Sequence, residues 1–302
     1  MENNLSDKNE NKEKKGRGVS HSKIILMGEH SVVYGYPAIA IPLKNIRMEC
    51  IVERATVPFV HNKKDTLSTA IYTALNYLNR KNENIKYKVI SDIPPKRGMG
   101  SSAAVSIAAI RGVLDYFNTE VDNLTLEKLV NEAEIIAHNT PSGLDAKTCL
   151  SDSAIKFIKN KGFKNLEMNL GAYLLIADTG IHGHTRDAIM NIKNMEDRAL
   201  PMLEKLGKLT EETEKFIEEK DVINIGKNMI SAHGELKKLG VSIEKSDILV
   251  KTAIDEGAYG SKMSGGGLGG CIIALMESRE KAEMTGKKLM EKGAVNIWIE
   301  AL

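Results

Sequence analysis

Hydrophobic and polar positions along the chain follow two periods, one typical of strands and one typical of helices. Short apolar or alternating runs predict strands, as in 47–53, where Met48, Cys50 and Val52 fall on one side. Apolar residues three and four positions apart predict helices, as in 66–79. Strands are expected at 23–28, 39–42, 47–53, 87–93, 155–158, 166–170, 172–177, 271–276 and 295–299. Helices are expected at 66–79, 103–113, 126–138, 197–209, 211–219, 222–239, 248–256 and 280–292.

This mixture of strands and helices predicts an α+β fold, and the strand–helix–strand order at the end predicts an α/β sandwich layer. The chain becomes mostly helical between 185 and 239, so we expect two domains, residues 18–175 and 176–302. Residues 1–17 are rich in Asn, Lys and Glu and have no apolar core. They predict a disordered tail and exclude a secretory signal.

The composition is that of an ordinary globular protein, with 42% hydrophobic and 27% charged residues in 302. A net charge of +2 gives no reason to expect a nucleic-acid partner. No apolar run approaches the roughly 18–20 residues that span a bilayer, so no membrane partner is expected. Cys50, Cys149 and Cys271 are far apart and form no CxxC pair. Reduced structural thiols and a cytoplasmic location are therefore expected.

The segment 94–104, PPKRGMGSSAA, carries the strongest functional signal. Gly98 and Gly100 let the backbone approach a ligand, and Ser101 and Ser102 precede the helix expected at 103–113. N–H groups at a helix N-terminus bind anions, so the segment predicts a phosphate-binding loop. The loop lacks the Lys of a Walker-type loop. The alternative is a tight turn with a serine cap, but two consecutive serines leave one hydroxyl for another role.

Two further segments contain polar residues that have both a structural and a functional interpretation. Lys23 interrupts an apolar strand that runs into Glu29 and His30, although a lysine in such a place commonly lies at a sheet edge. Asp145 lies in a capping box begun by Ser142, which explains it structurally. A carboxylate at a helix start is also well placed to accept a proton, because the helix dipole favours its ionised form.

Three other features have the same ambiguity. Glu134 lies on an otherwise apolar helix side, where it is either exposed or a metal ligand. The glycine-rich segment 262–270 is either a flexible loop or a second backbone surface that closes on a ligand. His182 and His184 suggest a metal, but no clustered third ligand accompanies them.

Taken together and in this order, the segments resemble the motifs of the GHMP kinases. Residues 23–38 are similar to the N-terminal motif of that superfamily, 94–104 to its P-x-x-x-G-x-G-S-S-A-A motif, and 262–270 to its C-terminal glycine motif. The resemblance runs from about Ser20 to the C-terminus. Galactokinases carry Asp-Tyr after Glu-His, a pair that is absent here.

Within the superfamily the chain resembles the mevalonate kinase family. KIILMGEHSVVYGYPAIA is close to that family's opening, 138–145 matches H-x-x-P-S-G-x-D, and 178–186 matches D-T-G…T-R. The chain length and the residues of the motifs are more similar to bacterial than to animal members of this family.

The resemblance implies a two-domain GHMP kinase fold, with an N-terminal domain like domain 2 of ribosomal protein S5 and a C-terminal ferredoxin-like α/β sandwich. It implies transfer of the ATP γ-phosphoryl group to the C5 hydroxyl of (R)-mevalonate, giving 5-phosphomevalonate and ADP in the mevalonate route to isoprenoids. Mg²⁺ is the implied cofactor, and ATP and mevalonate are the implied partners. A homodimer is left open.

The resemblance also implies roles for individual residues. Asp145 matches the proposed base for the C5 hydroxyl, or in a variant view an electrostatic group, and Lys23 matches its ion-pair partner. Ser102 and Glu134 match Mg²⁺ ligands. ATP binding is implied for Pro95, Lys96, Arg97, Gly98, Met99, Gly100, Ser101, Ser102 and Ala103. Substrate binding is implied for Lys23, Glu29, His30, Ser142, Asp145 and Thr185. Ser264, Gly265, Gly266 and Gly267 are implied to close the site.

Three alternatives accompany this interpretation. A phosphomevalonate kinase shares the G-x-G-S-S-A loop and needs extra cations for the substrate phosphate, for which Lys96 and Arg97 are available. A diphosphomevalonate decarboxylase has a differently worded loop. A non-enzymatic sensor is expected to lack the Lys or the Asp, but Lys23, Glu134 and Asp145 are all present.

Overall fold

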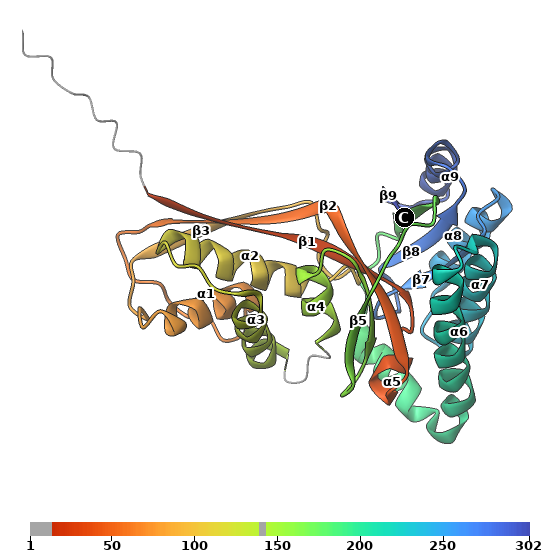
Figure 1. Cartoon of the computed structure of the whole chain (residues 1–302), viewed down its shortest axis with the longest axis horizontal. Helices are drawn as coiled ribbons and strands as arrows, with labels where there is room; N and C mark the ends of the chain where they lie inside the picture. The colour runs from red at the N-terminus through yellow and green to blue at the C-terminus, as the bar shows by residue number, and fades with distance from the viewer. Residues whose placement is uncertain (1–13, 139–142) are drawn as a thin grey trace, which may run out of the picture.

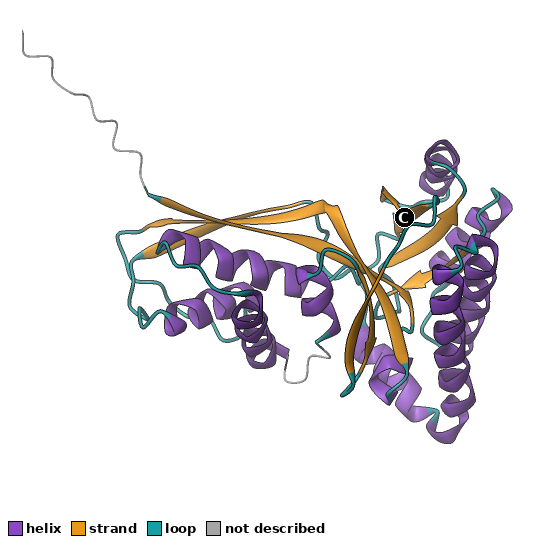
Figure 2. Cartoon of the chain, viewed as in Figure 1, coloured by secondary structure: helices purple, strands orange, loops and turns teal. Residues whose placement is uncertain are grey.

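The computed structural model describes residues 14–138 and 143–302 and contains two antiparallel sheets with helices packed on them (Figures 1 and 2). The first sheet comprises β1 (Lys15–Met27), β2 (Pro37–Arg54), β3 (Ile85–Ser91), β4 (Ala154–Ile158) and β5 (Gly162–Leu166). Its order is β1-β2-β4-β5, and β3 also pairs with β2. The long strand β2 therefore joins all the other parts of this sheet: β1 along most of its length, β3 at one end and β4 at the other.

Within the described residues, the α-helices of this half of the chain are α1 (Thr66–Tyr77), α2 (Ser101–Tyr116), α3 (Asn123–His138) and α4 (Leu144–Leu150). Helix α2 is central, because it packs on β1 and β2 and also contacts α1, α3 and α4. Its buried face is rich in small residues such as Ala104, Ala108 and Gly112, which let the helix axis lie close to the sheet. The short 3₁₀ helix η1 (Ser31–Tyr34) follows β1.

Strand β1 begins earlier than the sequence pattern predicts. Residues 15–17, expected in the tail, pair with 51–53 of β2. The prediction is wrong at these residues, because the inward positions there are Gly16 and Gly18, which add no apolar side chain to the pattern. A Cβ on Gly18 would lie 2.0 Å from the carbonyl oxygen of Ala108, so the glycines are required by the close approach of α2. Residues 1–13 of the expected tail lie outside the described residues.

The second sheet comprises β6 (Tyr173–Asp178), β7 (Gly260–Ser264), β8 (Cys271–Met276) and β9 (Asn296–Ala301), in the order β7-β8-β6-β9. Its helices are α5 (Thr185–Asn194), α6 (Leu200–Glu218), α7 (Val222–Lys238), α8 (Glu244–Asp255) and α9 (Arg279–Glu291), with the 3₁₀ helix η2 (Glu196–Ala199) between α5 and α6. Strand β6 is buried on both faces: Leu174 and Ile176 join the large core that also contains β1 and α2, whereas Leu175 and Ala177 pack with α8 and α9. The expected α/β sandwich layer is therefore confirmed.

Most predicted elements are present with shifted ends, and the strands expected at 39–42 and 47–53 form one strand, β2. Two further predictions are wrong. The second strand of the 155–170 hairpin is Gly162–Leu166, not 166–170, because this exposed strand buries almost no apolar side chain. The helices predicted at 197–209 and 211–219 form one helix, α6. The Thr210 hydroxyl donates to the carbonyl oxygen of Leu206 at 2.8 Å, so the helix continues through this polar position.

The whole of β6 belongs to the second sheet, including residues 173–175 that were expected in the first domain. Since a strand is hydrogen-bonded as a unit, we propose that the domain boundary lies between Leu166 and Tyr173 instead of after residue 175. The two parts share one apolar core, because Ile24 and Met27 of β1 belong to the same buried cluster as Ile273 of β8.

The packing of β1 on α2 predicts contrasting effects of two glycine substitutions. Gly18→Ala places a methyl group against helix backbone and should lower the free energy of unfolding by about 1–3 kcal/mol. Gly234→Ala lies on the exposed side of α7 with no atom within 4 Å, and should stabilise by about 0.5–1 kcal/mol. Urea unfolding of both variants measures the difference, and a Gly18→Ala protein as stable as the wild type would contradict the packing argument.

Candidate active site

A cavity of about 400 Å³ lies where β1, the starts of α2, α4 and α5, helix α3 and the turn after β7 meet. It brings together residues that are far apart in the sequence. Ten predicted site residues line it: Lys23, Glu29, His30, Gly98, Ser102, Glu134, Asp145, Thr185, Gly265 and Gly266. The cavity is therefore the candidate site.

The loop before α2 reaches the cavity through glycines in the left-handed region, with φ of 76° at Gly98 and 70° at Gly100. A Cβ on Gly100 would lie 2.8 Å from Cγ of Lys23, so glycine lets the loop cross this side chain. The backbone N–H of Lys23 donates to the carbonyl oxygen of Met99 at 3.2 Å. Gly100 is also the N-cap of α2 and provides no side-chain acceptor for the first N–H groups of that helix, which suits an anion.

Lys23 and Asp145 form an ion pair in this cavity. The distance between Lys23 Nζ and Asp145 Oδ1 is 2.7 Å. The lysine is buried, with 2% of its side chain exposed, whereas the carboxylate is 45% exposed. The strand thus fixes the cation, and the carboxylate remains accessible to a ligand.

The predicted capping box does not describe the start of α4. The N-cap residue is Gly143, with φ of 81° and no side-chain hydrogen bond, and Asp145 lies in the first turn. Ser142, the predicted cap and substrate-binding residue, lies outside the described residues. The Asp145 carboxylate is paired with Lys23, and this ion pair explains its position.

The carboxylate of Glu134 is the centre of a cluster of oxygen atoms at the start of α2. Its Oε1 accepts hydrogen bonds from the hydroxyls of Ser102 at 2.8 Å and Ser106 at 3.1 Å, and the residue is 7% exposed. The carboxylate belongs to α3, so the cluster joins two helices. Carboxylate and hydroxyl oxygens are hard donors, the set that Mg²⁺ prefers. These residues fit a magnesium ion bound beside the phosphate loop.

A second ion pair, between Glu29 and Lys262, lies at the inner wall of the cavity. Both side chains are fully buried, and Lys262 Nζ also donates to the carbonyl oxygen of Met263 at 2.8 Å. Burial lowers the pKa of Lys262 although Glu29 opposes this shift. Glu29 Oε2 and His30 Nε2 are buried without a hydrogen-bond partner among the described residues. Both residues line the cavity.

The turn after β7 closes the cavity from the other sheet. The Ser264 hydroxyl donates to the carbonyl oxygen of Ile25 at 2.8 Å, which attaches the turn to β1. A Cβ on Gly265 would lie 2.7 Å from Cα of Gly98, and one on Gly266 would lie 1.8 Å from Thr185 Oγ1. The two glycine segments therefore meet backbone to backbone, as expected of a second surface closing on a ligand.

Sequence reasoning missed the apolar part of the lining. Ile25, Val32, Ala146 and Ile189 line the cavity beside the charged groups. Apolar residues on strands and helices give the same pattern whether they face a core or a ligand, so no sequence signal separates them.

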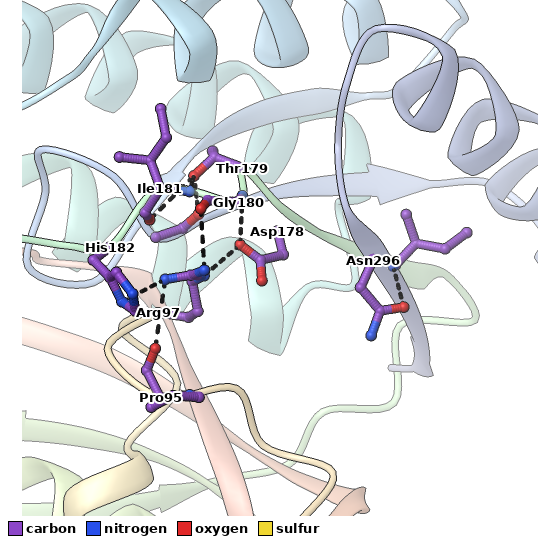
Figure 3. A network of polar contacts seen from close by, with 10 residues as sticks. Pro95, Arg97, Asp178, Thr179, Gly180, Ile181, His182 and Asn296 are labelled. Carbon is purple, nitrogen blue, oxygen red and sulfur yellow. Dashed lines mark hydrogen bonds and ion pairs between the residues drawn. The ribbon is translucent and has the colours of Figure 1, made fainter.

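Other predicted residues lie near the cavity without lining it: Pro95, Lys96, Arg97, Met99, Gly100, Ser101, Ala103, Ser264 and Gly267. Arg97 points toward the end of β6 and contacts Asp178 and His182 (Figure 3). Neither His182 nor His184 belongs to a metal-ligating group of three within the described ranges. The helices of residues 14–138 and 143–302 include none long and apolar enough to cross a membrane.

Phosphoryl transfer requires groups that bind phosphate, a cation and an acid–base group. The cavity contains groups of the corresponding kinds: an uncapped helix start, a cluster of hard oxygen donors and an accessible carboxylate beside a fixed lysine. Two family models match the chain, GHMP kinases N terminal domain over residues 68–152 and GHMP kinases C terminal over residues 213–293.

The mevalonate kinase of Pyrococcus furiosus is 31% identical, with 89% of this chain and 91% of that protein covered. The crystal structure of L. major mevalonate kinase in complex with R-mevalonate has a TM-score of 0.85 at 24% identity, covering 95% of this chain and 96% of that one. That of mevalonate kinase from methicillin-resistant Staphylococcus aureus has a TM-score of 0.78 at 29% identity, covering 96% and 99%.

The chain belongs to the GHMP kinases and, within them, to the mevalonate kinase family. The predicted kinase class and the two-domain GHMP kinase fold are thereby confirmed.

The burial of His30 predicts that the protein loses stability in acid. Burial, assisted by the nearby Lys262 ammonium, lowers its pKa to about 4, against about 6.5 in the unfolded chain. The unfolded chain therefore binds the proton first as pH falls. The stability that the neutral, buried His30 contributes is fully present above about pH 6.5 and is lost as the pH falls from about 6.5 to about 4.

Between pH 7 and pH 5 this loss amounts to about 2 kcal/mol. Urea unfolding at both pH values should show that His30→Gln loses less stability than the wild type by about this amount. His184→Gln, at an exposed position, is the control and should follow the wild type. Equal losses in His30→Gln and the wild type would contradict the burial argument.

Proposed function

We propose that the protein is a mevalonate kinase that transfers the γ-phosphoryl group of ATP to the C5 hydroxyl of mevalonate, giving 5-phosphomevalonate and ADP. The Lys23–Asp145 ion pair carries this proposal, because it puts an accessible carboxylate and a buried cation in the cavity that Gly98 and Ser102 also line. The membership in the mevalonate kinase family supports the choice of acceptor.

The acceptor hydroxyl binds beside Asp145, whose carboxylate accepts its proton as the oxygen attacks phosphorus. Lys23 is close enough to the same carboxylate to counter the negative charge that develops on the transferred group. Since phosphoryl transfer depends mainly on positioning and charge neutralisation, two rigidly held groups suffice for this part of the reaction.

The phosphates of ATP bind at the loop 95–103. The left-handed glycines bring the backbone close to the cavity, and the N–H groups at the start of α2 favour negative charge. Ser102 and Glu134 would hold Mg²⁺, which neutralises phosphate charge when it is bound. Ser101 serves the phosphates or the helix start.

The rest of the cavity suits a small, branched hydroxy acid. Ile25, Val32 and Ile189 provide an apolar wall for carbon atoms, and Glu29 Oε2 provides a buried acceptor for a hydroxyl group. His30 and Thr185, which also line the cavity, are the groups that face the substrate carboxylate as hydrogen-bond donors.

The charge of the lining argues against phosphomevalonate as the substrate. Among the described lining residues Lys23 is the basic one, whereas Glu29, Glu134 and Asp145 are acidic. Lys96 and Arg97, the cations that this alternative needs, do not line the cavity, and Arg97 is paired with Asp178. A second phosphate on the acceptor would therefore lack counter-charge.

A cytoplasmic setting is proposed with this function. Cys50, Cys149 and Cys271 are free and buried, and burial raises the pKa of each thiol. Such thiols are structural and poorly reactive, as expected of cysteines kept reduced.

Substitution of Asp145 tests the proposed base. Asp145→Asn removes the proton acceptor and keeps the shape of the side chain, so kcat should fall by roughly 10²–10⁴-fold. Thermal unfolding should remain cooperative, because the replaced carboxylate is partly exposed. Near-normal turnover of the folded variant would exclude Asp145 from this role.

Substitution of Ser102 tests the cation site. Ser102→Ala removes one oxygen from the cluster around Glu134, so a higher Mg²⁺ concentration should be needed for half-maximal activity. Ser153→Ala, on the loop before β4, is a control outside the cavity. Superimposable Mg²⁺ titrations of Ser102→Ala and the wild type would remove Ser102 from the ligand set.

The acceptor is tested by measuring ADP release with mevalonate, phosphomevalonate, galactose and homoserine side by side. We expect turnover with mevalonate, and rates with the other three near those without acceptor. Turnover of phosphomevalonate without turnover of mevalonate would overturn the proposed function and favour the alternative kinase.

A further inference from the structure

Arg97 lies in the phosphate loop but does not line the cavity, and its guanidinium points toward Asp178 at the end of β6 (Figure 3). Its Nε donates to Asp178 Oδ1 at 2.6 Å, and its Nη2 donates to the carbonyl oxygen of Gly180 at 3.2 Å. Its Nη1 lies 2.9 Å from His182 Nδ1, which accepts because a guanidinium can only donate. The ion pair is nearly buried, with side chains of Arg97 and Asp178 that are 11% and 4% exposed.

These contacts join the phosphate loop to the second sheet. Asp178 is the last residue of β6, and its Oδ1 also accepts from the backbone N–H of Gly180 at 2.8 Å, which holds the turn that follows. The carbonyl oxygen of Lys96 accepts from the backbone N–H of Gly183 at 2.8 Å. The loop is therefore attached to residues 178–183 by one side chain and one backbone bond. That segment leads directly into Thr185, which lines the cavity.

The loop has little intrinsic preference for its conformation. Lys96, Gly98 and Gly100 all have positive φ, and the residues between β3 and α2 belong to neither sheet. The attachment to 178–183 on one side and the Met99–Lys23 hydrogen bond on the other hold this loop. A fork of charge-assisted hydrogen bonds provides defined geometry, which a single lysine does not.

We propose that Arg97 and Asp178 are a positioning pair, which holds the phosphate loop in register with the Thr185 segment so that the ATP phosphates and the acceptor meet in line. The inference deepens the proposed function and rests on it. Arg97 acts through the loop and does not touch the nucleotide. A displacement of about 1 Å in such a loop can cost on the order of 100-fold in rate, so the pair matters without contacting the reacting atoms.

The competing assignment is direct contact between Arg97 and an ATP phosphate. To make it, the guanidinium would have to leave Asp178, whose carboxylate is nearly buried and would lose its counter-charge. The hydrogen bonds to Gly180 and His182 would break at the same time. The two assignments make opposite predictions for Asp178, since only the positioning role needs its carboxylate.

The experiment is a double-mutant cycle read by calorimetric binding of ATP in the presence of Mg²⁺ and in the absence of mevalonate. Arg97→Ala and Asp178→Asn should each weaken ATP binding on the order of 10–100-fold, because each breaks the same attachment. The double variant should bind no more weakly than the weaker single variant. Arg97→Lys should recover part of the affinity and serves if Arg97→Ala does not fold, since it retains one bond to Asp178.

Several outcomes would overturn the proposal. If Asp178→Asn binds ATP as well as the wild type while Arg97→Ala binds it more weakly, Arg97 contacts the phosphate directly. Fully additive losses in the double variant indicate two independent roles. Wild-type affinity in Arg97→Ala and Asp178→Asn shows that the attachment is dispensable.

Lys156→Met is the matched control. It breaks the partly buried Lys156–Glu214 pair, at 2.5 Å, between β4 and α6 and outside the cavity. Lys156→Met should lower Tm without changing the Kd of ATP. If Lys156→Met weakens ATP binding as much as Arg97→Ala does, the effect of Arg97→Ala comes from a general loss of stability, and the proposal is overturned. Because ATP binding is measured without mevalonate, a protein that binds ATP but does not phosphorylate mevalonate contradicts the proposed function alone.

Discussion

The site depends on the close approach of backbone segments around strand β1. The strand receives the phosphate loop through the carbonyl oxygen of Met99 and the glycine turn through the Ser264 hydroxyl. Both segments come within van der Waals distance because Gly98 and Gly265 have no side chains. Lys23, on the same strand, lies against Gly100 of the loop and lines the cavity. The glycines thus determine where the charged groups of the site can lie.

Three ion pairs organise the site, and each joins residues distant in the sequence: Lys23–Asp145, Glu29–Lys262 and Arg97–Asp178. They differ in exposure, and exposure separates their roles. The carboxylate of the first pair is accessible and can react, whereas the second is fully buried and supports the wall. The third lies outside the cavity, behind the loop. Buried ion pairs of this kind fix geometry more than they add stability.

The sequence predicts most elements and the charged site residues, since periodicity, glycine spacing and polar residues within apolar runs all leave a signal. It fails where that signal is absent. Gly16 and Gly18 remove the apolar pattern from the first residues of β1, and the exposed strand 162–166 has no apolar face. Ile25 and Ile189 look like core residues although they line the cavity. The partner of Arg97 could not be predicted either, because an ion pair between a loop and a distant strand depends on tertiary packing.

The Glu29–Lys262 pair has a consequence for the independence of the two halves. Glu29 follows the first strand of the chain, and Lys262 belongs to a strand of the second sheet. Either half, expressed as a separate fragment, would expose one of these charges in a surface shaped to bury it, beside apolar residues such as Ile24 that share a core with the other half. We therefore expect the two sheets to unfold together, and during synthesis Glu29 lacks its partner until the strand that contains Lys262 has left the ribosome.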